Sequence, residues 1–143
     1  MTWLYWVGVS AGFGAAAGIW VSGLPLRRTL PLVDALAVLA VGALAGRAVS
    51  GPHRGHWSDI AAGALGGLLA YLGSSVIVAG AFRRGGTRIG LAILMFGIAF
   101  TAAVLAFIPV VGVLEAVALP LLAWRLRRAQ PERYAGLRTL AKD

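Results

Sequence analysis

The sequence predicts an all-α, polytopic membrane protein with five transmembrane helices, and three observations lead to this prediction. Apolar residues make up 59% of the chain and charged residues 13%, against roughly 45–50% and ~25% in soluble proteins. From Ile89 to Trp124 the only ionisable side chain is Glu115. The arginines gather in short turns between apolar segments, a pattern that is typical of membrane proteins.

The first three predicted spans are bounded by helix-breaking or charged residues. The first ends at Pro25-Leu26-Arg27-Arg28, and the second carries Pro31 in its first turn, where a proline leaves no hydrogen bond unmade. The third lies between a polar loop and the basic turn Arg83–Arg88. At about 1.5 Å per residue each span can cross a hydrocarbon core of roughly 30 Å. We place these spans at about 3–24, 30–49 and 59–82.

The long apolar run after Arg88 is predicted to form two further spans. As one helix it would measure roughly 54 Å, which exceeds the membrane even with tilt. Pro109 and Gly112 lie near its centre, where a proline removes a backbone hydrogen bond and a glycine permits a reversal. We therefore expect helices at 89–107 and 111–128 that form a tight hairpin, with the turn at Pro109–Gly112.

The basic residues predict the orientation of the chain. With five spans, eleven of the thirteen Lys and Arg residues lie on one side of the membrane and only Arg47 and Arg54 on the other. The positive-inside rule then places the N-terminus outside and the C-terminus in the cytoplasm. We expect a single transmembrane domain over residues 1–128 and a basic cytoplasmic tail over 129–143, in a multi-pass protein of the bacterial cytoplasmic (inner) membrane.

Composition also bears on the partners. The net charge of +8 predicts contact with anionic phospholipid headgroups at the basic tail, and no motif indicates nucleic acid. The chain has no cysteine, which excludes disulfides and thiolate sites. Small residues recur four apart, as in Gly14/Gly18 and Gly42/Gly46. We interpret these as close helix packing within the bundle, with a homo-oligomer interface as the alternative.

Glu115 is the main candidate for a polar site. An ionisable group inside a span costs about 2.5–3.5 kcal/mol at mid-membrane, so each such residue is a functional hypothesis. Glu115 is expected in the outer half to middle of the bilayer, and Arg47 is the only basic residue predicted at a similar depth. Three interpretations stay open: an Arg47–Glu115 ion pair, a functional carboxylate, or a neutral packed side chain.

The polar loop before the third span adds His53, His56 and Asp59 to the candidate polar site. The spacing His53-x-x-His56-x-x-Asp59 can supply three metal ligands, with Glu115 as a fourth. Two histidines in a loop are also common as surface residues, so we predict no metal and no cofactor. No nucleophile–base set, phosphate-binding loop or dinucleotide motif is present, and no catalytic residue is predicted.

Hydroxyl side chains within the spans are candidates for lining a cavity with Glu115. They are Tyr71, Ser74, Ser75 and Thr101. Serine and threonine can also bond back to their own helix, which is the ordinary alternative.

Three functional hypotheses follow. The first is transport or handling of a small solute or lipid, and it depends on Glu115. The second is a non-catalytic structural or accessory subunit, and it depends on the basic tail. The third, which depends on the polar loop, is a membrane-embedded enzyme acting on lipid headgroups; we do not predict an enzyme on these grounds.

Overall fold

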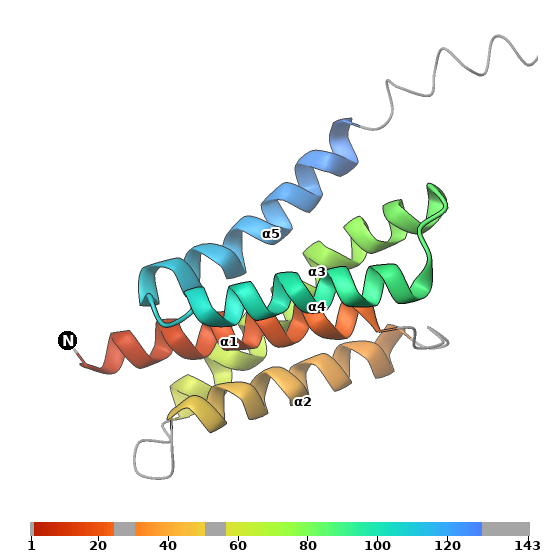
Figure 1. The fold of residues 1–143 in the computed structure, drawn as a ribbon. Coiled ribbons are helices and arrows are strands. Elements are labelled where there is room, and N and C mark those ends of the chain that lie inside the picture. Colours follow the sequence, from red (N-terminus) through yellow and green to blue (C-terminus); the bar gives the residue numbers. More distant parts are fainter. Residues whose placement is uncertain (1, 25–30, 51–56, 130–143) are drawn as a thin grey trace, which may run out of the picture.

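The computed structural model describes residues 2–24, 31–50 and 57–129, and within these ranges the chain consists of helices and the short turns that join them (Figure 1). The predicted all-α class is confirmed for this part of the chain. The predicted tail and the loop with His53 and His56 lie outside the described residues. The helices are α1 (Thr2–Gly23), α2 (Pro31–Ser50), α3 (Trp57–Arg83), α4 (Arg88–Leu105) and α5 (Pro109–Ala129).

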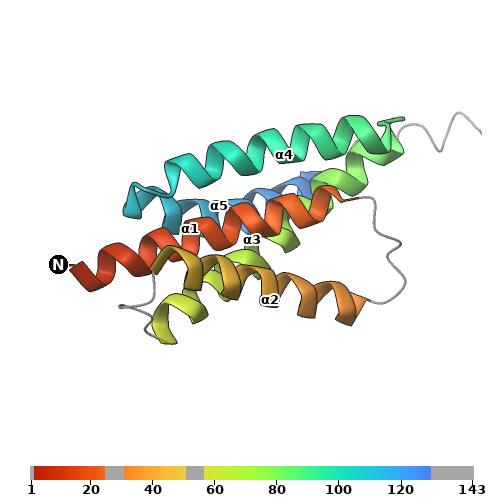
Figure 2. The same cartoon turned by 60° about the horizontal axis from the view of Figure 1, so that its bottom comes forward.

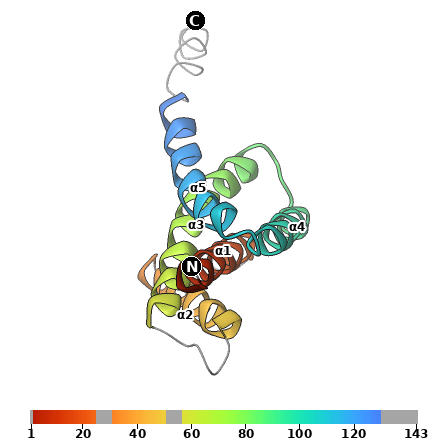
Figure 3. The ribbon, with the colours of Figure 1, turned by 90° about the vertical axis from the view of Figure 1, so that its left-hand side faces the viewer.

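Helix α1 lies at the centre of the bundle and contacts each of the other four helices. Viewed nearly end-on, α2, α3, α5 and α4 surround it (Figure 3). In the rotated view α4 lies on one side of α1 and α2 on the other (Figure 2). The first residues of α1, the end of α2 and the turn between α4 and α5 lie at the same end of the bundle (Figure 1). We call this the N-terminal end.

Glycines bring α1, α2 and α3 into backbone contact. A Cβ added at Gly42 of α2 would lie 2.5 Å from the carbonyl oxygen of Gly63 in α3. A Cβ at Gly14 of α1 would collide with the same carbonyl. Gly63 therefore sits where three helix backbones meet, which requires the absence of a side chain. Such close approach is how helices associate in lipid, where the hydrophobic effect gives no preference for helix over lipid. The predicted small-residue packing within the bundle occurs here.

The basic turn between α3 and α4 has the compact form that the sequence predicts. Gly85 adopts a positive φ of 85°, and the Gly86 amide donates to the Ala81 carbonyl over 3.0 Å, as in a Schellman helix end. Thr87 then caps α4, because its hydroxyl accepts a hydrogen bond from the Gly90 amide at 3.2 Å.

The turn between α4 and α5 differs from the prediction in two ways. It lies at residues 106–108, so the expected turn at Pro109–Gly112 is wrong: Pro109 is the first residue of α5. A proline suits that position because its missing N–H would have no helical partner there. The Gly112 amide already donates to the Ile108 carbonyl at 3.2 Å. The two arms are also not a tight hairpin, since α4 and α5 hardly touch beyond the turn.

Three of the described helices are long and apolar enough to cross a membrane, judged by length and composition. They are α1 over Trp3–Gly23, α3 and α4. The other two helices, α2 and α5, have comparable lengths of 20 and 21 residues. The structure is therefore compatible with a membrane protein.

Candidate functional site

The divergence of α4 and α5 follows from what each packs against. Helix α4 stays on α1: a Cβ added at Gly12 would lie 2.5 Å from Ala106 Cβ, and one at Gly23 would lie 2.5 Å from Met95 Cβ. Helix α5 starts beside α1 and then crosses to α3, where a Cβ added at Gly73 would lie 2.7 Å from the Leu119 carbonyl carbon. The two arms therefore separate from a shared turn.

The turn itself is held against α1. The Tyr5 hydroxyl donates to the Phe107 carbonyl over 3.1 Å, and the Phe13 and Phe107 rings meet edge to face at 5.3 Å between centroids. A Cβ added at Gly112 would lie 2.5 Å from the Gly8 carbonyl oxygen. The space between the diverging helices α4 and α5 forms a wedge. Its narrow end, at the turn, is thus held against α1, and its open side lies farther along the two helices.

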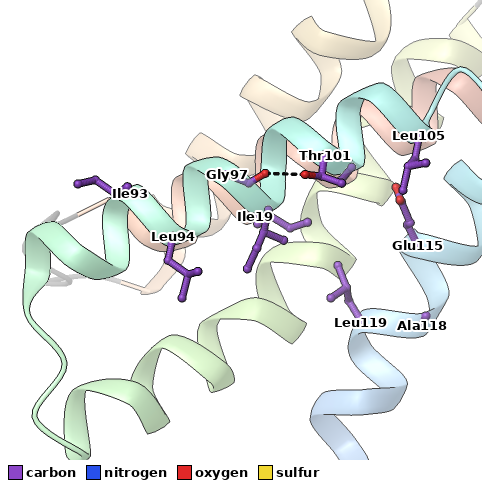
Figure 4. A pocket seen from close by; sticks show the side chains of 11 residues that line it. Ile19, Ile93, Leu94, Gly97, Thr101, Leu105, Glu115, Ala118 and Leu119 are labelled. Carbon is purple, nitrogen blue, oxygen red and sulfur yellow. Dashed lines mark hydrogen bonds between the residues drawn. The ribbon is translucent and has the colours of Figure 1, made fainter.

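A pocket of about 730 Å³ occupies this wedge, with α4 and α5 as its walls and α1 behind it (Figure 4). Ile93 is 67% exposed and Leu94 57% exposed, so the α4 wall faces the surroundings of the protein as well as the pocket. We call this space the α4–α5 pocket. It is lined by Ile19, Ile93, Leu94, Gly97, Ile98, Thr101, Ala102, Leu105, Glu115, Ala118 and Leu119.

Among the described residues that line the pocket, Glu115 alone carries a charged side chain. It projects from α5 towards α4 and lies beside Leu105, near the N-terminal end of the bundle (Figure 4). The side chain is half-buried. Its Oε2 atom is buried and accepts no hydrogen bond from any described residue. Because a buried acceptor without a donor is costly, this carboxyl is the least satisfied group in the pocket.

One of the four predicted cavity hydroxyls, Thr101, lines the pocket together with Glu115. It donates to the Gly97 carbonyl at 3.0 Å (Figure 4), so its proton is used within α4. The other three are elsewhere. Ser74 and Ser75 donate to carbonyls of their own helix, at 2.7 Å and 3.0 Å, and the Tyr71 hydroxyl donates to Asp34 Oδ2 of α2 at 3.3 Å.

Arg47 does not meet Glu115. It is exposed in the last turn of α2, and α2 makes no contact with α5. Helices α1 and α3 lie between them (Figure 3). Equal depth along the membrane normal does not place two residues on facing sides of a bundle. The Arg47–Glu115 ion pair, one of the three interpretations left open for Glu115, is therefore absent from the described structure.

Asp59 is buried separately, in the first turn of α3, where it is 1% exposed. Its Oδ1 atom has no hydrogen-bond partner among the described residues. It is held at the junction with α2, since a Cβ at Gly46 would collide with the Asp59 carbonyl oxygen. No group of three His, Asp or Glu side chains in the described part of the chain could hold a metal ion.

The apolar lining was not anticipated from the sequence. Gly97 contributes open space, because a Cβ added there would meet nothing within 4 Å. One signal was available: Gly97 and Thr101 are four residues apart and therefore share a helix face. The flanking leucine and isoleucine residues carry no such signal, since lipid-facing positions have the same composition.

Comparison with protein-family models, curated proteins and solved structures finds no match for this chain.

Proposed function

We propose that this protein is a five-span protein of the bacterial cytoplasmic membrane that handles a hydrophobic small solute or lipid through the α4–α5 pocket. The observation that carries the proposal is a single carboxyl, Glu115, in a pocket that opens between two diverging helices and whose other described side chains are apolar except for Thr101. Its volume of about 730 Å³ falls within the roughly 300–1,000 Å³ of small-molecule sites. A polar solute would find few partners on these walls.

Two further observations support five spans. At about 1.5 Å per residue, α2 and α5 are roughly 30 Å long, which matches the hydrocarbon core. Their charged residues lie mostly near the ends, and Asp34 accepts a hydrogen bond from Tyr71 of the neighbouring α3. The arginines of the α3–α4 turn and of the end of α5 then share the cytoplasmic side.

The test is whether the pocket takes an apolar guest. Gly97→Leu fills the pocket and Gly80→Leu is its matched control, because an added Cβ meets nothing within 4 Å at either glycine. Gly80 is not part of the lining. In nanodiscs, photolabelling by adamantyl diazirine is expected to mark Glu115 and Leu119 saturably.

The variants separate the outcomes. Gly97→Leu should reduce this labelling at least fivefold, whereas Gly80→Leu should leave it unchanged. Equal labelling of both variants would refute the pocket proposal. It would favour the second candidate, an accessory subunit, which is supported by the glycine-packed α1–α3 core and by the exposed arginines Arg83, Arg84, Arg88, Arg125 and Arg128.

A further inference from the structure

The carboxyl of Glu115 lacks a donor that the described protein can supply. Thr101 is the only other polar side chain that the described residues contribute to the lining, and its hydroxyl donates a hydrogen bond to the Gly97 carbonyl. Arg125 is ten residues farther along α5, about 15 Å away along the helix axis. Arg88 is at the opposite end of α4 from Leu105. No described side chain is therefore placed to satisfy Glu115 Oε2, and the carboxyl of Glu115 is the charged group that a ligand in the pocket would meet.

The walls restrict what that ligand can be. A bare divalent cation needs six or more oxygen ligands, or at least several with water, and the lining offers only one carboxylate and one hydroxyl among apolar side chains. An organic cation differs because it carries its own apolar body. Such a molecule would place its charge on Glu115 and its hydrocarbon against the isoleucine and leucine side chains of α4.

The dimensions fit a molecule with one hydrocarbon tail. The α4 wall runs from Ile93 to Leu105, about 18 Å at 1.5 Å per residue. Glu115 lies beside Leu105, so the charged group is at one end of the pocket and the apolar length extends from it (Figure 4). Glu115 is also six residues into α5, or about 9 Å from its first residue. A head group at this depth is reachable from the nearer membrane surface.

We infer that the α4–α5 pocket binds a lipophilic amine, whose protonated nitrogen donates to Glu115 and whose hydrocarbon tail lies along α4. This inference rests on the proposed function and names its ligand class. A protonated amine gives the carboxylate both a charge partner and a hydrogen bond, and hydrogen bonds to ionised groups are the stronger kind. A fatty acid would place two carboxyl groups together, and a fatty alcohol would leave the charge unmatched.

The test is a competition series with one tail and four head groups. A diazirine-bearing dodecylamine is photolinked to the full-length protein in phosphatidylcholine nanodiscs, where no anionic lipid concentrates the amine. Dodecylamine, dodecyltrimethylammonium, dodecanol and dodecanoate then compete. Dodecylamine should compete at least tenfold better than dodecanol, dodecyltrimethylammonium should be intermediate because it has charge without an N–H, and dodecanoate should be weakest.

Variants identify the residue that is responsible. Glu115→Gln should abolish the preference for amine over alcohol, and Glu115→Asp should retain part of it. Each competitor is compared between wild type and variant. Its partition into the bilayer is the same in both preparations and therefore cancels from the ratio of the two competition strengths. An amine preference that survives in Glu115→Gln, or no preference in the wild type, would overturn the inference.

Failure of this inference can be told apart from failure of the proposed function. If the head groups compete equally but Gly97→Leu abolishes labelling and Gly80→Leu does not, the pocket proposal stands and the amine is wrong. If Gly97→Leu instead converts an oligomer to monomers and dodecylamine never competes, a second copy of the chain occupies the wedge. Both proposals are then wrong. Mass photometry of each nanodisc preparation gives the oligomeric state.

Discussion

At the scale of single residues, the carboxyl of Glu115 is expected to lower the free energy of unfolding of the unliganded protein. Its Oε2 atom is withdrawn from solvent without a protein donor, and such an atom costs about 1–3 kcal/mol when fully buried. Because the side chain is only half-buried, we expect Glu115→Leu to stabilise the unliganded protein by about 1 kcal/mol. Thermal unfolding in detergent, followed by circular dichroism, measures the change. Glu115→Gln is the control and should have little effect, and a loss of stability in Glu115→Leu would show that the carboxyl has a partner.

The sequence predicted the polar site only in part. Glu115 and Thr101 do share a pocket, because α4 and α5 are joined by a short turn and separate only beyond it. Arg47 has a suitable depth but lies on α2, which does not contact α5. Sequence position gives the depth of a residue in a span, whereas its direction around the bundle depends on which helices pack together. His53 and His56, outside the described residues, stay as predicted candidates.

At the scale of helices, α3 offers two glycines with opposite surroundings. A Cβ added at Gly63 would collide with the Gly42 carbonyl, and one at Gly80 would meet nothing within 4 Å. Gly63→Ala is therefore expected to destabilise the protein by about 1–3 kcal/mol, the usual cost of overpacking. Gly80→Ala should be neutral or stabilising by up to about 1 kcal/mol, because alanine favours helix. Unfolding by titrated sodium dodecyl sulfate compares the two, and equal stability would contradict the three-helix junction at Gly63.

Helix boundaries show which local signals can be followed. The helix-breaking and charged residues that bound the first three predicted spans place their ends, at about 24, 49 and 82, within one residue of the ends of α1 (Gly23), α2 (Ser50) and α3 (Arg83). Pro109 was misplaced by the same reasoning, since a proline can end a helix or begin one. The backbone hydrogen bonds show that it begins one here. The Ile108 carbonyl accepts from the Val111 amide at 2.9 Å, so α5 has already started at Pro109. Gly112 is used for contact with α1, where a Cβ would lie 2.5 Å from the Gly8 carbonyl oxygen.

At the scale of the whole molecule, the central place of α1 has a physical reason that periodicity does not reveal. Its glycines and alanines present small surfaces in several directions, so that α3, α4 and α5 can all approach its backbone. Each of the described helices is apolar around most of its circumference, so no polar face marks the side that turns outward. The number and approximate lengths of the helices could therefore be predicted, but not their neighbours. The pocket, which depends on the separation of α4 from α5, could not be predicted either.

The orientation in the membrane is the last prediction, and it belongs to the molecule as a whole. Five spans place the arginines of the α3–α4 turn on the same side as those at the end of α5, Arg125 and Arg128, and moving this many positive charges across the membrane opposes the positive-inside preference. Alkaline phosphatase fused after Asp143 should therefore be inactive in bacteria, and green fluorescent protein at the same position should fluoresce. Fusions within the α2–α3 connection, at Gly55, should give the reverse pattern. Active phosphatase both after Asp143 and at Gly55 would contradict five spans, because it would mean an even number of spans after Gly55, with α5 lying along the membrane surface.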